Sequence, residues 1–377
     1  MNILLLSAYD AQSHRYWRET MVQSFPEFDW QVLALPARHF SYRVRANPLN
    51  WLAVNSAALA KHYDLVVATS TVDLATLRGI CPALAHVPAW LYCHENQFAY
   101  PDNPAHSVPD AHRLAAQMVF VYACLAAQAI SFNSRWNHDS AMAGIRKLSS
   151  RLPEPIDERL IAGIASRSQV LPVPVDSAAA GARPSRAAGA PLRILWNHRW
   201  EFDKGPDLLL AIIRQLVACE FSCELAIVGQ QFRSRPAAFD AIDELLKNTA
   251  HSSAVRLSHW GYVSAREDYL ALLGQSDVVL STAWHDFQGL AVLEAVAAGA
   301  VPLLPDRLAY PELFAPGFMY SDSDGDATAS ARSACDKLLT WQQQGLPPVP
   351  DLSDLSVAAL RPRYRQQMID LVASANR

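Results

Sequence analysis

Short apolar runs alternate with amphipathic stretches along the first half of the chain. The apolar runs have the length and continuity of parallel strands buried on both faces, and they lie at 2–7, 31–35, 64–68, 89–93 and 129–133. Between them, apolar residues recur at helical spacing at 51–62, 111–127 and 136–148. Strands that alternate with helices predict a doubly wound α/β domain, which binds ligands at the carboxyl ends of its strands.

The second half repeats this alternation. Its expected strands lie at 193–197, 224–228, 256–259, 278–281 and 301–304. The segment 177–191 consists mainly of small residues without any period, which is typical of an interdomain linker. Because 377 residues exceed what one hydrophobic core normally serves, we expect domains at 1–176 and 192–350, followed by a terminal helix at 351–377.

Composition narrows the class of protein. Apolar residues make up 51% of the chain and charged residues 18%, which favours a globular, soluble fold over disorder. No apolar run reaches the ~18 residues of a membrane span, and the apolar start is too short for a signal peptide. The six cysteines show no metal-ligand spacing, so a reduced, cytoplasmic protein is expected.

One motif in the second half suits a sugar ligand. Asp286 and Glu294 flank Gly289, which opens an apolar helix. The N–H groups of Gln288, Gly289 and Leu290 can bind hydroxyl or phosphate oxygens, while the two carboxylates can accept bonds from hydroxyl pairs. The alternative is that Asp286 only caps the helix and Glu294 is solvated.

A second motif supplies positive charge. Arg199 and Lys204 lie on a loop between an expected strand and an expected helix. A guanidinium and an ammonium at a helix N-terminus can neutralise a diphosphate leaving group.

These two motifs resemble the donor half of retaining GT-B glycosyltransferases of the family 4 type, with Asp286 in place of the usual Glu. The resemblance implies an α/β GT-B fold, in which two Rossmann-like doubly wound domains face each other across a cleft and the last helix crosses back to the first domain. It also implies that Arg199 and Lys204 stabilise the diphosphate, that Glu294 binds the ribose, and that Tyr262 packs against the nucleobase.

The N-terminal half also carries family motifs. They are Ser13-His14, Leu35-Pro36-Ala37-Arg38, Tyr42-Arg43-Val44-Arg45 and the run from His94 to Pro101. Together with Trp196–Glu201 and Pro305–Leu313, they resemble the glycosyltransferase family that includes the tRNA-queuosine mannosyltransferases.

This second resemblance implies roles for residues of the first domain. His94 would lie at the anomeric carbon, while Ser13, His14, Glu95, Asn96 and Gln97 would contact the acceptor or a phosphate. The alternatives are that His94 is a strand-end histidine bonded to backbone and that Ser13 caps a helix.

An acid-free segment bears on the acceptor. No Asp or Glu lies between Asp29 and Asp64, whereas Arg38, Arg43 and Arg45 lie there among aromatic residues. Arginines interleaved with aromatics can bind phosphates and stack unpaired bases, although the net charge of −4 indicates no general affinity for nucleic acid. The alternative is an exposed loop whose aromatics enter the core, and the resemblance favours the RNA acceptor.

The combined expectation is a retaining, metal-independent glycosyltransferase that moves mannose from GDP-mannose onto queuosine in tRNA. Neither a metal nor a cofactor is expected beyond the nucleotide-sugar, because the sequence has no metal-binding motif. Two alternatives stay open: the same chemistry on a lipid, glycan or small molecule, and a non-catalytic protein that binds nucleotide-sugar or RNA. The sequence leaves the oligomeric state open.

Overall fold

The computed structural model describes residues 1–101, 109–176, 190–232, 235–251, 253–323 and 325–375. The chain divides into two compact units, each of them α/β. Unit 1 comprises Met1–Pro174 and Val357–Arg377, and unit 2 comprises Val175–Ser356. Most of the expected linker at 177–191 lies outside the described residues.

The centre of unit 1 is a six-stranded sheet in the order β2-β1-β3-β4-β5-β6. Every pairing in it is parallel. Chain order reverses at β1, between its neighbours β2 and β3, and this is where doubly wound sheets bind ligands. The strands are β1 (Asn2–Asp10), β2 (Asp29–Pro36), β3 (Leu65–Thr69), β4 (Ala89–Cys93), β5 (Ala129–Phe132) and β6 (Ser168–Val170).

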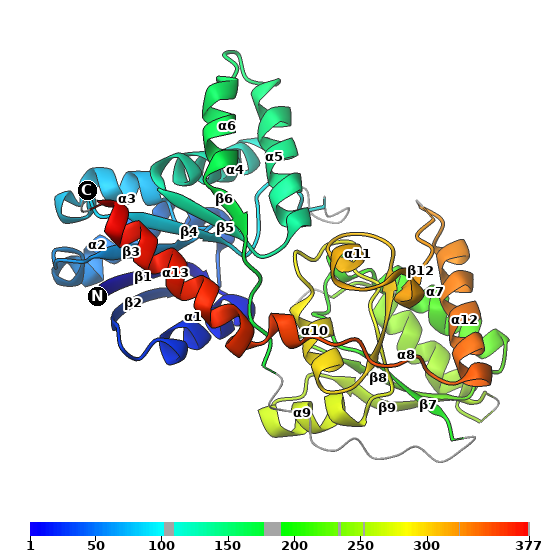
Figure 1. The fold of residues 1–377 in the computed structure, drawn as a ribbon. Coiled ribbons are helices and arrows are strands. Elements are labelled where there is room, and N and C mark those ends of the chain that lie inside the picture. Colours follow the sequence, from blue (N-terminus) through cyan, green and yellow to red (C-terminus); the bar gives the residue numbers. More distant parts are fainter. Residues whose placement is uncertain (102–108, 177–189, 233–234, 252, 324, 376–377) are drawn as a thin grey trace. The chain divides into compact units, whose positions relative to one another are not determined.

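Helices cover both faces of this sheet, and α5 and α6 stand side by side beyond it (Figure 1). The helices of unit 1 are α1 (Gln12–Ser24), α2 (Phe40–Leu59), α3 (Leu74–Ile80), the 3-10 turn η1 (Pro82–Leu84), α4 (Asp110–Ala126), α5 (Arg135–Ser149), α6 (Glu158–Ser166) and the C-terminal α13 (Val357–Ala375).

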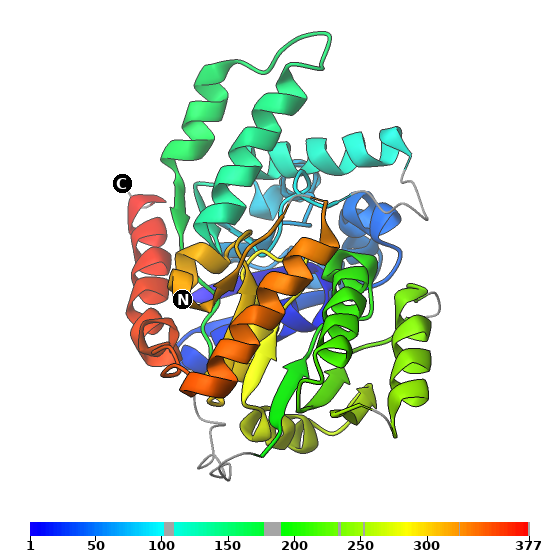
Figure 2. The ribbon, with the colours of Figure 1, turned by 90° about the vertical axis from the view of Figure 1, so that its right-hand side faces the viewer.

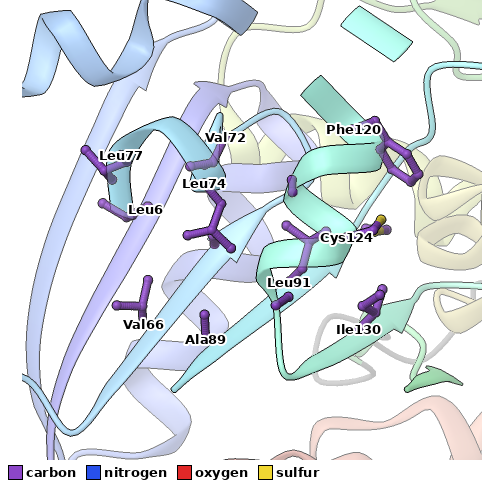
Figure 3. Close-up of a cluster of buried hydrophobic side chains, with 14 of the residues drawn as sticks. Leu6, Val66, Val72, Leu74, Leu77, Ala89, Leu91, Phe120, Cys124 and Ile130 are labelled. Carbon is purple, nitrogen blue, oxygen red and sulfur yellow. The ribbon is translucent and has the colours of Figure 1, made fainter. Parts of the chain in front are cut away.

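The core of unit 1 follows from the alternation of strand side chains. On β4, Ala89, Leu91 and Cys93 face the apolar layer under α3 and α4, which Figure 3 shows with Leu6, Val66 and Phe120. The intervening Trp90 and Tyr92 stack instead with aromatic residues of α1 and α13. Both faces are therefore buried, as the continuous apolar runs predict.

Tyr364 joins α13 to this second layer. Its ring is fully buried, and its hydroxyl accepts a hydrogen bond of 3.1 Å from the Trp17 indole. The same hydroxyl lies 2.9 Å from both the Tyr92 hydroxyl and the Pro172 carbonyl oxygen. The end of the chain is thus built into the core of unit 1.

Unit 2 contains a second six-stranded parallel sheet, in the order β12-β11-β10-β7-β8-β9. Its strands are β7 (Leu192–Trp196), β8 (Cys223–Val228), β9 (Val255–Gly261), β10 (Val278–Leu280), β11 (Val301–Pro305) and β12 (Met319–Tyr320).

The helices of unit 2 form two layers. In Figure 2, α7 (green) and α12 (orange) lie side by side against one face of the sheet, over a core that includes Ile194 and Trp196. α9 and α10 pack on the opposite face around Leu195 and Val228. The helical elements are η2 (Phe202–Lys204), α7 (Pro206–Ala218), α8 (Ala238–Thr249), α9 (Arg266–Gln275), α10 (Leu290–Ala297), α11 (Tyr310–Leu313), η3 (Pro316–Phe318), α12 (Ala327–Gln344) and η4 (Ser353–Leu355).

Pattern and structure agree on ten of the strands, which begin and end within a few residues of the expected positions. The short edge strands β6 (Ser-Gln-Val) and β12 (Met-Tyr) were not expected, because neither contains a continuous apolar run of strand length. The expectation of a helix beginning at residue 51 was wrong, since α2 already begins at Phe40 and continues through Pro48. None of the helices in the described part of the chain is long and apolar enough to cross a membrane.

We expect Tyr364→Phe to lower the free energy of unfolding by about 1–3 kcal/mol, because the buried Trp17 N–H loses its acceptor. Urea denaturation of the full chain measures this change. Tyr122→Phe is the control, because Tyr122 is exposed. Equal stability of the two variants would contradict the structural role of the Tyr364 hydroxyl.

Candidate active site

The loop after β7 and the loop after β10 meet around Lys204 in unit 2. Lys204 ends the 3-10 turn η2, and Gly205 then adopts a φ of 65° before Pro206 begins α7. A Cβ at residue 205 would overlap the carbonyl oxygen of Thr282, which lies on the second loop. The close approach of the two loops therefore requires glycine at this position.

The Lys204 ammonium is buried and surrounded by oxygen. It donates a hydrogen bond of 2.6 Å to the His285 carbonyl, and it lies 3.4 Å from Asp203 and 3.7 Å from Asp286. Since an unpaired buried charge costs several kcal/mol, the two carboxylates lie where they compensate the burial of the Lys204 ammonium.

Arg199 is partly exposed beside the same cluster. Its guanidinium lies 2.5 Å from Glu201 and 3.8 Å from the fully buried Asp203. The two cations that the sequence assigns to a diphosphate are therefore already paired with acids in this structure. A bound diphosphate would have to share or replace the pairing with Glu201.

Two histidines that were not expected complete this cluster. Burial, together with the positive charge of Lys204, lowers the pKa of His198 to about 4 and that of His285 to about 4. Both imidazoles are thus neutral near pH 7, and the positive charge of the cluster stays with Lys204 and Arg199. Burial is the largest single influence and acts to raise the pKa of Asp286, but Lys204, the two neighbouring histidines and the Gly289 amide together outweigh it, so the net shift is downward.

The Asp286 carboxylate interacts with both the Gly289 amide and the Lys204 ammonium. One carboxylate oxygen accepts a hydrogen bond of 3.1 Å from the Gly289 amide, while the other faces Lys204. Gly289 has a φ of 76° and precedes Leu290, where α10 begins. Gln288 is buried next to this turn. Gly289 is itself the N-cap of α10 and no side chain caps the helix, so Asp286 stabilises the turn before α10 and pairs with Lys204, but it does not cap the helix.

Glu294 and Tyr262 occupy other parts of unit 2. The Glu294 carboxylate is half-buried and lies 2.7 Å from the Arg266 guanidinium, so it is not simply solvated. Tyr262 follows β9 with an exposed ring. Asn197, at the end of β7, donates a hydrogen bond of 2.8 Å to the Ala291 carbonyl in the first turn of α10, which joins the Lys204 loop to the Glu294 helix.

A pair of stacked imidazoles marks the carboxyl edge of the sheet in unit 1. The rings of His14 and His94 lie 4.3 Å apart at 22°, and Trp17 contacts His94 edge-on at 4.9 Å. Burial lowers the pKa of His14 to about 4 and that of His94 well below its usual value. Both rings are neutral near pH 7, so they offer hydrogen bonds and no charge to a ligand.

Each ring of this pair has one buried nitrogen that forms no hydrogen bond with the described part of the chain. These two nitrogens are His14 Nδ1 and His94 Nε2. The structure shows no bond from the His94 ring to backbone among the described residues; only the His94 carbonyl accepts a hydrogen bond, of 3.0 Å, from the Asn133 amide. Ser13 does not cap α1, since Ala11 is the N-cap and no side chain caps it.

The residues after His94 differ in role. Asn96 is buried, donates to Ser140 and to both oxygens of Asn137, and accepts from two amides of its own loop. It therefore holds the loop in shape and has little capacity left for a ligand. Glu95 and Gln97 are half-buried on the same loop.

Most of the acid-free segment is the helix α2, which carries Arg43 and Arg45, while Arg38 lies on the short loop between β2 and α2. Within α2, Arg43 is buried and bonded to Asn50, so its guanidinium presents little surface to an acceptor. Arg38 is exposed, and Arg45 is half exposed while it pairs with Asp73 at 3.1 Å. Tyr42 is exposed beside them, whereas Trp51 lies in the core.

Both halves of the chain match families of known proteins. Residues 2–175 match the family model described as tRNA-queuosine alpha-mannosyltransferase N-terminal, and residues 152–307 match Family 4 Glycosyltransferase in conflict systems. The tRNA-queuosine alpha-mannosyltransferase of Drosophila melanogaster is 29% identical over 333 residues, which cover 86% of this chain and 84% of the relative. These matches support its assignment to the tRNA-queuosine alpha-mannosyltransferase family, and they show that the chain is a glycosyltransferase.

Solved structures confirm the fold of this glycosyltransferase. HepE of Anabaena in complex with UDP is 14% identical, with a TM-score of 0.58 over 100% of this chain and 98% of that one. The UDP-forming trehalose-phosphate synthase of Burkholderia vietnamiensis is 13% identical, with a TM-score of 0.61 over 100% and 99%. At these identities the likeness shows the two-domain α/β GT-B fold alone.

Several members of the glycosyltransferase's cluster escaped the sequence analysis. His198 stands in the quoted run Trp196–Glu201 and Asp203 directly precedes Lys204, so both could have been chosen for their chemistry. His285 precedes Asp286 directly. Arg266, by contrast, lies on α9 with no motif around it, and only the folded chain brings it to Glu294.

We expect Gly205→Ala to lower the melting temperature of the glycosyltransferase and to weaken nucleotide binding. Left-handed backbone costs a non-glycine residue roughly 1–2 kcal/mol, and the new Cβ would also push the Thr282 loop away. Thermal melting and calorimetric titration with nucleoside diphosphates measure both effects. Gly163→Ala on α6 is the control, because nothing lies within 4 Å of its Cβ position, and it should be neutral or stabilising. Similar behaviour of both variants would contradict the role of Gly205.

Proposed function

We propose that this glycosyltransferase transfers mannose from GDP-mannose to queuosine in tRNA, with retention of configuration and without a metal ion. The observation that carries the donor part is the buried Lys204 ammonium between Asp286 and the His285 carbonyl, at the carboxyl edge of the sheet. The acceptor and the sugar are supported by the relative from Drosophila melanogaster, whose name states both.

Lys204 and Arg199 serve the diphosphate in this proposal. As the bond between the sugar and the diphosphate breaks, negative charge grows on the leaving oxygen. A preorganised ammonium and a guanidinium can stabilise that charge, which is the part that a metal ion plays in other transferases. Among the described residues, no group of three or more His, Cys, Asp or Glu is arranged to hold a metal.

The sugar, the ribose and the nucleobase of the donor also bind to residues of unit 2 in this proposal. The turn at Gln288, Gly289 and Leu290 presents the first amides of α10 to the sugar, with Asp286 beside it. Glu294 accepts bonds from the ribose hydroxyls, and the exposed Tyr262 ring covers the nucleobase.

Unit 1 serves the acceptor and the reacting carbon. His94 is neutral, and its buried Nε2 has no partner among the described residues, so it can bond a sugar hydroxyl without adding charge. The His14 ring stacks on His94, and the exposed Ser13 precedes His14 in the chain. Glu95 and Gln97 lie on the loop that follows His94. The tRNA contacts Arg38, on the loop before α2, and Tyr42 and Arg45 on α2. An acceptor of this kind fits a cytoplasmic location of the enzyme.

Retention follows a front-face route in this proposal. The acceptor oxygen bonds to the anomeric carbon on the side from which the diphosphate leaves, and the acceptor proton passes to a diphosphate oxygen. Asp286 is occupied by Lys204 and the Gly289 amide, which leaves it poorly suited to act as a covalent nucleophile.

The donor and the acceptor are tested together by incubating the full chain with GDP-mannose, GDP-glucose, UDP-glucose or UDP-galactose and queuosine-containing tRNA. Mass analysis of the nucleosides should show one added hexose with GDP-mannose. We expect Lys204→Ala to lower turnover by roughly 100- to 1,000-fold, as with other groups that stabilise developing charge. Lys247→Ala is the control, because Lys247 is exposed on α8 of the same unit.

Transfer from another nucleotide-sugar would change the donor in this proposal. Transfer to a glycan or a lipid but not to tRNA would replace the acceptor. An anomer of inverted configuration, assigned by NMR, would reject the front-face route.

We expect Arg38→Gln and Arg45→Gln each to weaken tRNA binding at low salt and to reduce the slope of log K against log salt by about 0.7–0.9 per phosphate contact. Filter binding at several salt concentrations measures the slope. Arg43→Gln should instead lower the melting temperature, because Arg43 is buried. Lys247→Gln serves as the charge-matched control, and an unchanged slope in the Arg38 and Arg45 variants would place the tRNA on another surface.

A further inference from the structure

Trp284 is the one exposed residue in the stretch 281–289, which follows β10. Its exposed fraction is 39%, whereas the nearby apolar residues Ala283 and Phe287 are buried. The chain has ten tryptophans, and the other nine are buried or half-buried. Since single apolar side chains are common on protein surfaces, exposure alone does not point to a ligand. The contacts that hold this ring in place do.

One face of the Trp284 indole is covered by arginine. The Arg307 guanidinium lies 3.7 Å from the centre of the ring, where a planar cation stacks on an aromatic face. Arg307 donates hydrogen bonds of 2.9 Å to the Ala283 carbonyl and 3.3 Å to the Thr282 carbonyl. It also pairs with Asp322 at 2.6 Å. The guanidinium is therefore fixed, and the exposed surface of the indole lies on its other face and its edge.

The backbone places this ring beside the Lys204 cluster. The Trp284 amide donates a hydrogen bond of 2.8 Å to the carbonyl of Asp203, the residue before Lys204. The indole Nε1 lies 3.2 Å from the Cβ position of Gly205, the residue after Lys204. Trp284 also precedes Asp286 by two residues. An open aromatic face thus lies next to the cation and the carboxylate that the proposed function assigns to the diphosphate and the sugar.

A hexose ring is a suitable partner for such a face. Its hydroxyl groups leave patches of C–H on the faces of the ring, and these patches lose contact with water when they pack on a flat aromatic surface. An indole that is already held in place loses little conformational freedom on binding. Hexoses differ in which hydroxyls are axial, and an axial hydroxyl on the packed face would hold the two rings apart. An aromatic face therefore selects among hexoses by shape.

We propose that Trp284 is a sugar-binding residue, whose open face packs on the C–H face of the donor hexose and contributes to the choice of the hexose. Arg307 lies on the opposite face of the indole and leaves this side free for the sugar. The inference rests on the proposed function, which places the donor sugar beside Asp286.

The test compares two ligands that differ by the hexose. Calorimetric titration of the full chain with GDP-mannose and with GDP measures how the sugar changes the affinity. We expect Trp284→Ala to weaken GDP-mannose binding roughly five- to twentyfold, as for the loss of one aromatic packing surface, and to leave GDP binding unchanged. Trp284→Phe should recover part of the GDP-mannose affinity, because a smaller aromatic ring still packs on the sugar.

Tyr122→Ala is the control, because it removes an exposed aromatic ring from unit 1. It should leave the affinities for both ligands unchanged. An equal loss of affinity for GDP and GDP-mannose in Trp284→Ala would overturn the inference, because the indole would then support the loops around Lys204 and not the sugar. Unchanged GDP-mannose binding in that variant would overturn it as well.

The wild-type chain separates this inference from the proposed function. If it transfers mannose while Trp284→Ala keeps the ratio of the GDP-mannose and GDP affinities, the proposed function holds and the role of Trp284 fails. If it transfers another hexose, the mannose donor fails, and the same titration with that nucleotide-sugar and its nucleoside diphosphate decides whether Trp284 binds the sugar. If it binds no nucleotide-sugar, both fail.

Discussion

The buried charge of Lys204 is the constraint on which the donor-side cluster depends. An ammonium inside a protein needs oxygen around it, and unit 2 supplies Asp203, Asp286 and the His285 carbonyl from two separate loops. These loops approach closely because residue 205 has no side chain. The two loops thus supply the oxygen atoms that surround the Lys204 ammonium. The ammonium lies at the edge of the sheet, where the proposed function places the diphosphate.

Burial of histidine has the same consequence in both units. His198 in unit 2 and His14 and His94 in unit 1 are kept neutral because desolvation disfavours the imidazolium form. Positive charge is thereby confined to lysine and arginine, while the histidines contribute neutral hydrogen-bonding groups. A sugar has many hydroxyls and no charge, whereas a diphosphate is strongly anionic. Neutral histidines suit the sugar of the proposed donor, and the lysine and arginine suit its diphosphate.

Acids have three different roles in this enzyme. Asp203 is fully buried and compensates cations, Asp286 joins a cation to a helix N-terminus, and Glu294 is held half-exposed by Arg266. The Asp286 and Glu294 positions look equivalent in the sequence because each is an acid beside the same helix. Their chemistry differs because their surroundings differ in burial and in the number of donors.

The alternation of apolar strands and helices in the sequence was enough to determine the α/β class and most strands, since strands buried on both faces need continuous apolar runs. Family motifs also singled out Lys204, Asp286 and His94 in advance. Only the tertiary structure decided that Arg43 is buried and that Arg266 pairs with Glu294. Burial of a single arginine and contacts between separate helices depend on packing, which leaves no local pattern in the chain.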